Sequence, residues 1–175
     1  MALTPYDLDP VHSQLGFSVR HLMITHVHGV FAKWTGAFSI DPADLTKSQV
    51  SVDIEAASVD TRNAQRDGHL KSPDFFDVAN HPSIRFVSTH VAPTDTGFTL
   101  TGDFTLRGVT KSVAFDVVAA GPAKDSQGKG RRGYRAQGRI NRHDFGVAWS
   151  ASYEGGALVV GEHVDLVLDL QLIPR

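Results

Sequence analysis

Three histidines near the start of the chain form the first pattern that could support chemistry. His26 and His28 are two positions apart, so on an extended strand their rings would share one face, with His21 nearby in the sequence. Neutral imidazoles in this arrangement can bind zinc or another transition metal. However, a catalytic zinc needs three protein ligands and a structural one needs four, and no pair of carboxylates follows at a matching distance. We therefore interpret His26 and His28 as surface residues at a turn.

Nucleophilic catalysis would need a different set of residues. A serine-hydrolase arrangement would combine Asp9, His12 and Ser13, but adjacent residues on a strand point to opposite faces. No glycine-flanked nucleophile elbow follows. Cysteine is absent, which excludes thiol catalysis, disulfides and Cys-based zinc sites. The sequence therefore does not favour a nucleophilic enzyme.

A polar segment offers a possible anion site. Arg62, Arg66, Asp67, His69 and Lys71 lie in a stretch with good helix formers and no alternation. They could bind an anionic head group, but such a mixture is also typical of an exposed helix face with weak ion pairs. We favour the exposed face. We expect a short helix within 61–72, capped by Thr61, followed by two phenylalanines at 75 and 76 that close one end of the sheet structure.

Most of the remaining chain alternates between apolar and polar residues, which is typical of strands with one buried face. Leu15, Phe17, Val19 and His21 share one face, and a break at Gly29 precedes the next strand. The same pattern recurs near 38–40, 50–54, 84–86, 98–106, 113–117, 134–140 and 164–172. Turns are expected at 93–97, at 107–108, in a polar loop over 121–133, and at Gly155–Gly156.

About eight long antiparallel strands must avoid exposed edges, either by closing into a barrel or by stacking as two sheets. Long alternating strands with one helical insertion favour an up-and-down barrel, and eight strands can enclose one small ligand. Gly36, Gly102, Ala136 and Gly138 fall in the inward phase and are expected to leave room among larger side chains. A ligand there would be long and apolar.

The composition limits the classes of partner. The chain of 175 residues is read as a single domain, 1–175. Its 17 basic and 19 acidic residues give a net charge of -2, which argues against nucleic-acid binding. No apolar run is long enough to cross a bilayer, and the first residues do not have the pattern of a signal peptide. We therefore expect a cytoplasmic protein without stable membrane insertion.

The pattern of residues spread along the whole chain resembles that of a known family. The order and spacing of these positions are similar to the YceI-like polyisoprenoid-binding family, and the resemblance covers nearly the whole chain. The matching residues are Tyr6, Asp9, His12–Ser13, Phe17, Arg20–His21, Gly29, Phe31, Gly36, Asp67, His69–Leu70, Ser72–Pro73, Phe75–Asp77, His81–Pro82, Ile84, Phe86, Gly102, Leu106–Lys111, Arg142, Asp144–Gly146, Gly161–Glu162 and Val164.

The resemblance implies an all-β, lipocalin-like barrel of eight antiparallel strands with one short helical insertion. Its elongated apolar cavity would hold an isoprenoid lipid, such as a polyprenyl phosphate or a quinone tail, and the protein would form a homodimer. No cofactor other than this lipid is expected. We expect His21 and Arg20 to hydrogen-bond near the polar end of the ligand. The residues expected to line its chain are Phe17, Val19, Phe31, Phe38, Phe86, Phe104 and Leu168.

Two other functions remain open. The protein could be an enzyme that uses His21 as a general acid or base on an apolar substrate inside the barrel, although no partner for this histidine is visible in the sequence. Alternatively, the barrel could be packed solid and act as an interaction domain. A non-catalytic lipid-binding module is our leading hypothesis.

Overall fold

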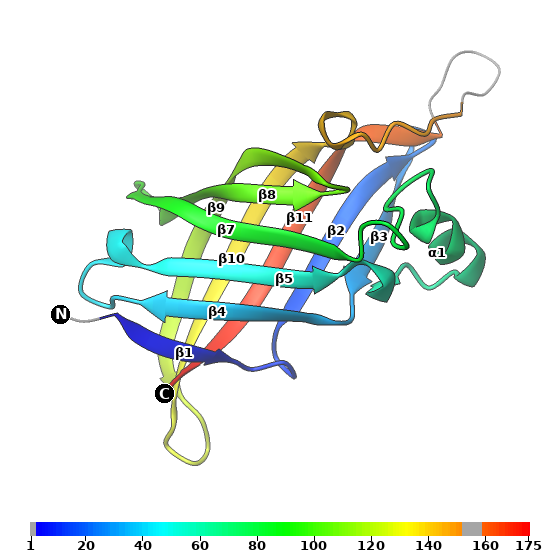
Figure 1. The fold of residues 1–175 in the computed structure, drawn as a ribbon. Helices are drawn as coiled ribbons and strands as arrows, with labels where there is room; N and C mark the ends of the chain where they lie inside the picture. Colours follow the sequence, from blue (N-terminus) through cyan, green and yellow to red (C-terminus); the bar gives the residue numbers. More distant parts are fainter. Residues whose placement is uncertain (1–2, 152–158) are drawn as a thin grey trace.

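A computed structural model describes residues 3–151 and 159–175. In these ranges, eleven strands form one antiparallel sheet that closes on itself (Figure 1). The strands are β1 (Thr4–Leu8), β2 (Gln14–His21), β3 (Thr25–Phe31), β4 (Trp34–Ile40), β5 (Gln49–Glu55), β6 (Val59–Asp60), β7 (Ser83–Pro93), β8 (Phe98–Leu106), β9 (Val109–Lys124), β10 (Gly130–Asn141) and β11 (Val160–Pro174). The helix α1 spans Ala64–Lys71, and short 3₁₀ helices span Leu45–Lys47, Ala56–Ser58 and Arg142–Phe145.

The eleven strands occupy eight positions around the barrel, because three positions each contain two strands placed end to end. One half of β11 pairs with β2, where Leu168 faces Leu15, and the other half pairs with β1, where Leu172 faces Leu8. In the same way β3 pairs with β2 while β4 pairs with β1, and β6 pairs with β3 while β5 pairs with β4. The predicted eight-stranded antiparallel barrel is therefore confirmed.

The junction between β1 and β2 is held by Asp9, which is buried. Its Oδ1 accepts hydrogen bonds from the backbone N–H groups of Val11 and His12, and its Oδ2 accepts one from Nε2 of Gln171 on β11. The hydrogen bond between Asp9 and the His12 ring holds the pKa of the carboxyl below its usual value. Asp9 thus fixes the point where the chain leaves one strand and enters the next, and Ser13 Oγ is bound to the backbone N–H of Gln171.

Two predicted breaks in the strand pattern differ from the structure, and a third prediction is not tested by it. Gly29 lies inside β3, and the chain turns earlier, at Leu22–Ile24, so His26 and His28 lie on the exposed face of a strand. The expected loop over 121–133 is mostly strand, because Asp125 accepts hydrogen bonds from the backbone N–H groups of Gln127 and Lys129 and closes a short connection. The predicted turn at Gly155–Gly156 lies outside the described residues.

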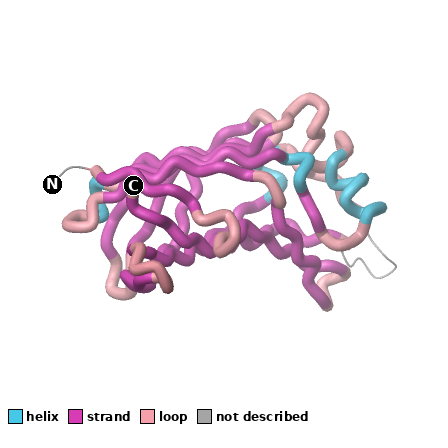
Figure 2. The backbone as a smooth tube through the Cα atoms, turned by 90° about the horizontal axis from the view of Figure 1, so that it is seen from below, coloured by secondary structure: helices cyan, strands magenta, loops and turns pink. Residues whose placement is uncertain are grey.

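The predicted helix is present, but its cap was assigned to the wrong residue. Asn63 caps α1, because its Oδ1 accepts a hydrogen bond from the backbone N–H of Arg66 at 2.9 Å. Thr61 is buried instead, and its hydroxyl donates to Asp67 and accepts from Nε of Arg66. Figure 2 shows α1 and its neighbouring loops at one end of the elongated barrel. The helix therefore covers the end that the strands leave open.

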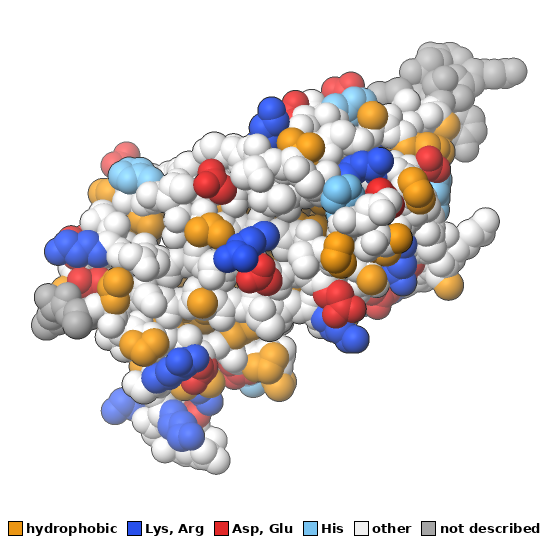
Figure 3. Space-filling view, viewed as in Figure 1, with side chains coloured by type: hydrophobic (Ala, Val, Ile, Leu, Met, Phe, Trp, Pro, Cys, Tyr) orange, Lys and Arg blue, Asp and Glu red, His pale blue; other side chains and the backbone are white. Residues whose placement is uncertain are grey.

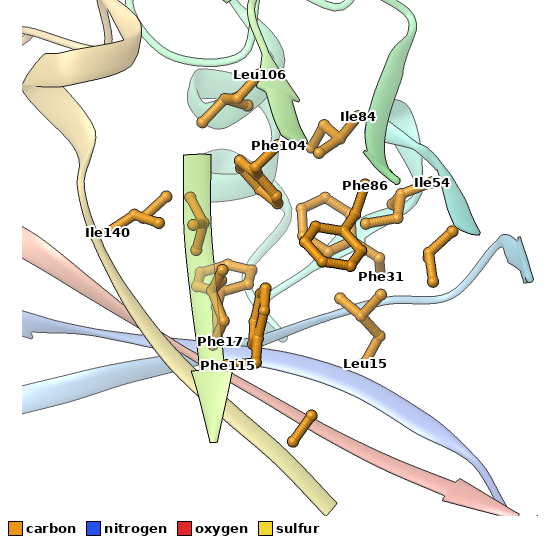
Figure 4. Packing of buried hydrophobic residues seen from close by; sticks show 14 of the residues in the cluster. Leu15, Phe17, Phe31, Ile54, Ile84, Phe86, Phe104, Leu106, Phe115 and Ile140 are labelled. Atoms are coloured by element: carbon orange, nitrogen blue, oxygen red, sulfur yellow. The ribbon is translucent and has the colours of Figure 1, made fainter. Parts of the chain in front are cut away.

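Four glycines allow phenylalanine rings to lie flat against the inner wall of the barrel. A Cβ added at Gly29 would overlap the Phe17 ring, and additions at Gly36, Gly102 and Gly138 would overlap Phe38, Phe86 and Phe115. Figure 4 shows several of these rings converging on one interior. The prediction that Gly36, Gly102 and Gly138 leave free room is therefore wrong, since a neighbouring aromatic ring already fills each space. At these positions the missing side chain of glycine lets a phenylalanine ring pack closely against the backbone.

Gly102→Ala is expected to lower the free energy of unfolding by about 2 kcal/mol, because overpacking a core typically costs this much. Its Cβ would meet the Val87 carbonyl oxygen as well as the Phe86 ring, and a backbone atom cannot move aside easily. Gly16→Ala is the control, because the nearest atom to its Cβ would be 3.4 Å away. Denaturant unfolding of both variants checks this, and equal midpoints would contradict it.

The outer surface carries both signs of charge. Figure 3 shows Lys, Arg, Asp and Glu side chains interspersed over the visible face. Cross-strand ion pairs such as Arg139–Asp165 and Arg135–Asp169 contribute to this pattern. In the part of the chain that the structure describes, no helix combines the length and the apolar composition needed to cross a bilayer.

Candidate functional site

The barrel encloses a cavity with a volume of about 300 Å³. This cavity reaches the end of the barrel that α1 covers, and a smaller cavity of about 80 Å³ lies farther from α1. The two cavities share Val50, Leu100, Ala136 and Leu170 as lining residues. The shared residues place the two cavities one after the other along the interior. The combined space is long and bounded mainly by apolar side chains, so the barrel is not packed solid.

The predicted ligand-binding residues all lie at these cavities. Eight of them line the larger cavity, and Phe38 lines the smaller one. The alternation along β2 explains why Phe17, Val19 and His21 face inward, because every second residue of a strand points to the same face. Arg20 is out of this phase and lines the cavity where β2 ends. Contact of these nine residues with a ligand stays a prediction. The eight residues are Phe17, Val19, Arg20, His21, Phe31, Phe86, Phe104 and Leu168.

The polar side chains that line the larger cavity gather at the end covered by α1. They are Arg20 and His21 from the end of β2, Arg66 and His69 from α1, and Arg142 after β10. Among the described residues that line the cavity there is no aspartate or glutamate. The cavity therefore combines a long apolar part with one end whose polar groups are arginines and histidines.

Arg142 is the functional candidate that the sequence reasoning missed. Its side chain is only 3% exposed, and its guanidinium donates hydrogen bonds to the carbonyl oxygens of Val147, Trp149 and Gly161 at 2.7–2.8 Å. Burial lowers the pKa of this guanidinium, and the charge of Glu162 opposes the shift. An arginine stays charged under these conditions. A signal existed, because Arg142 continues the inward phase of Ala136, Gly138 and Ile140.

An aromatic cluster connects α1 to the segment that follows Arg142. The His69 ring lies edge-on to Phe75 and Trp149, with ring centroids 5.0 and 4.9 Å away. Its Nε2 lies 2.8 Å from Oδ2 of Asp74, which fixes the orientation of the ring. Since Trp149 also accepts a hydrogen bond from Arg142 through its backbone oxygen, these groups form one connected wall.

The polar residues of the segment 61–72, which we interpreted as an exposed helix face, lie in different surroundings. Arg62 is exposed, whereas Arg66 and His69 reach the cavity. Arg66 is held there by two hydrogen bonds to Thr61, one from Nε to the hydroxyl and one from a terminal nitrogen to the carbonyl oxygen. The exposed-face interpretation is therefore wrong for these two residues, because buried Thr61 binds Arg66, and His69 packs against Phe75 and Trp149.

His26 and His28 point away from the cavity. Both are exposed on β3, with their ring centroids 6.3 Å apart. Within residues 3–151 and 159–175, no three side chains of the His, Asp or Glu type are grouped closely enough to hold a metal ion.

Comparison with curated proteins finds relatives of similar length. A UPF0312 protein from Pseudomonas savastanoi pv. phaseolicola is 39% identical over 142 residues, which is 81% of this chain and 74% of the relative. A UPF0312 protein from Photorhabdus laumondii is 37% identical over 139 residues, which is 79% of this chain and 72% of the relative.

Solved structures share the barrel. The Campylobacter jejuni YceI protein superposes with a TM-score of 0.77 at 30% identity, covering 89% of each chain. BcnA from Burkholderia cenocepacia gives 0.83 at 22% identity, covering 94% of this chain and 99% of its own. A polyisoprenoid-binding domain from Saccharophagus degradans gives 0.67 at 16% identity, covering 99% of each. The YceI-like domain model matches residues 6–172, and this chain therefore belongs to the YceI-like family.

Proposed function

We propose that this protein binds an isoprenoid lipid in the barrel and sequesters or transports it without changing it chemically. The observation that carries the proposal is the form of the cavity, which is long, apolar and polar at one end only. The candidate lipids are a polyprenyl phosphate and a quinone with an isoprenoid tail.

The apolar part of the cavity suits an uncharged chain. Its walls are Phe, Leu, Ile and Val side chains from every part of the barrel, such as Phe86, Phe104 and Leu168. Burying such a chain is favourable by about 0.8 kcal/mol for each CH₂ group. The larger cavity lies at the lower end of the range of roughly 300–1,000 Å³ that is typical of small-molecule sites. Affinity should therefore depend mainly on chain length.

The polar end suits an acidic or hydrogen-bond-accepting head group. Arginine donates hydrogen bonds and stays charged, and a histidine ring nitrogen can also donate. A phosphate would be favoured by Arg20, Arg66 and Arg142, and a quinone carbonyl could accept from His21 or His69. An ammonium head group would find no carboxylate among the described lining residues.

The comparisons support this proposal at the level of the family. The Saccharophagus degradans domain, which has the same fold, is described as polyisoprenoid-binding. The homodimer that the resemblance implies stays a prediction, and sedimentation velocity of the purified protein would check it.

Native mass spectrometry of gently purified protein tests the proposal directly. We expect a copurifying lipid whose mass matches an isoprenoid, and reloading of the delipidated protein when a polyprenyl phosphate or a quinone is titrated. Quenching of Trp149, which lines the cavity, provides a second readout. Absence of any lipid in repeated preparations, together with no binding on titration, would contradict the proposal.

The enzyme alternative is tested by His21→Gln. Glutamine keeps a hydrogen-bonding group at this position but cannot act as a general acid or base near neutral pH. A carrier should lose affinity only modestly in this variant. An enzyme should instead retain binding and lose turnover of the bound lipid, which mass spectrometry would detect as a missing product.

A further inference from the structure

The turn between β2 and β3 exposes consecutive apolar side chains. Ile24 is 80% exposed and Met23 is 41% exposed. Leu22 and Met23 adopt left-handed backbone conformations, with φ of 53° and 61°. Residues other than glycine rarely adopt this conformation, and bulky ones least of all. Hydrogen bonds from the Leu22 N–H to the Val159 carbonyl and from the Ile24 N–H to the His21 carbonyl hold the turn in place. The protein thus maintains an unfavourable backbone that presents apolar groups to solvent.

This turn lies beside the polar end of the cavity. Arg20 and His21, which line the cavity, directly precede Leu22, and Val159, which binds its N–H, lines the cavity as well. Arg20 is exposed while lining the cavity, so the enclosed space reaches the surface at this position. The turn and α1 occupy the same end of the barrel (Figure 1). The exposed apolar groups therefore mark the rim of the cavity opening.

The chain segment that carries the turn contains basic residues and no acidic residue, whereas Glu162 and Asp165 lie on the paired strand β11. Residues 10–40 contain no aspartate or glutamate. Arg20 precedes the turn, and the exposed His26 and His28 follow it on β3. Apolar side chains flanked by basic residues are the combination by which peripheral proteins bind the headgroup region of anionic membranes.

We propose that Leu22–Ile24 docks the cavity opening onto an anionic lipid bilayer, with Met23 and Ile24 inserted at headgroup depth. The inference rests on the proposed function, because an isoprenoid lipid resides in bilayers and must enter the barrel from one. A second copy of this chain is a poorer occupant, because turn-to-turn contact would bring the basic residues together and block the opening.

Vesicle flotation tests the proposal. The wild-type protein is expected to float with vesicles of equimolar phosphatidylglycerol and phosphatidylcholine, and less with phosphatidylcholine alone. The double variant Met23→Asp, Ile24→Asp should bind the anionic vesicles about tenfold more weakly or worse, because it removes the apolar area that would be buried.

Val11→Asp is the matched control. Val11 is 82% exposed and lies in the β1–β2 connection, roughly 25 Å from the turn along the length of β2. Val11→Asp introduces one of the two carboxylates of the double variant at a side chain as exposed as Ile24, and it should float like the wild type. Ile24→Trp keeps the turn apolar, and its fluorescence should shift to the blue when anionic vesicles are added.

Titration of a detergent-solubilised polyprenyl phosphate separates this inference from the proposed function. The double Asp variant should bind this ligand like the wild type, since Met23 and Ile24 do not line the cavity. The docking proposal is overturned if the wild type stays with the aqueous fraction, if the double variant floats equally well, or if its only effect is on the oligomeric state. Vesicle binding by a protein that takes up no ligand would overturn the proposed function and leave the docking surface supported.

Discussion

Arg142→Leu is expected to destabilise the protein by about 3 kcal/mol, the largest stability effect that we predict for a single substitution. Leucine fills much of the volume but leaves the carbonyl oxygens of Val147, Trp149 and Gly161 without their donor. A buried polar group that loses its partner costs roughly 1–3 kcal/mol, and removal of the buried charge offsets part of the total. Urea unfolding at neutral pH measures the difference.

Arg139→Leu is the matched control for this prediction. Arg139 lies three positions earlier and pairs with Asp165 on the exposed face of the sheet. Exposed ion pairs contribute little to stability, so this variant should unfold near the wild-type midpoint. Equal losses in the two variants would show that the buried hydrogen bonds of Arg142 are not its main contribution.

Ala136→Phe is expected to reduce affinity for a long isoprenoid by about a hundredfold or more while sparing a short one. Ala136 is buried and lines both cavities, so a phenyl ring there would separate them. Excluding about four CH₂ groups from apolar surroundings costs about 3 kcal/mol, which corresponds to more than a hundredfold in affinity. Titrations with isoprenoid alcohols of increasing length, followed by tryptophan fluorescence, measure the effect.

Ala114→Phe on β9 provides the comparison, because Ala114 is exposed and the added ring would face solvent. Its affinities should follow those of the wild type at every chain length. If Ala136→Phe and the wild type showed the same dependence on length, the ligand would not extend past this point. The proposal of a single long chain through both cavities would then fail.

Alternation alone predicted the barrel and much of the cavity wall. Phe17, Val19 and His21 were placed inside because a strand exposes every second side chain to the same face. The same rule identifies Arg142 when it is extended beyond Ile140, but arginine is so often exposed that its residue type predicts the opposite. The hydrogen-bond acceptors that satisfy Arg142 come from distant segments, and no local pattern shows them.

Other features depended on which strands become neighbours. Gly102 is filled by Phe86 from the adjacent strand, so its effect on cavity volume is decided by register and not by its own size. The division of one barrel position between β1 and β2 likewise depends on Asp9 reaching Gln171 across the sheet. The cap of α1 was misassigned because Thr61 and Asn63 are both suitable residues, and burial of Thr61 decides between them.

The closure of the barrel has a consequence for the order of folding. Several pairs of neighbouring strands, such as β8 and β9, are hairpins that can form from local contacts, whereas closure pairs Tyr6 with Pro174 and Val19 with Val164. Pairing residues that are so distant in sequence has a high entropic cost, because a long loop must close, and such pairings tend to form late. The enclosed cavity therefore does not exist before these two pairings form, and a lipid would bind only to the fully assembled barrel.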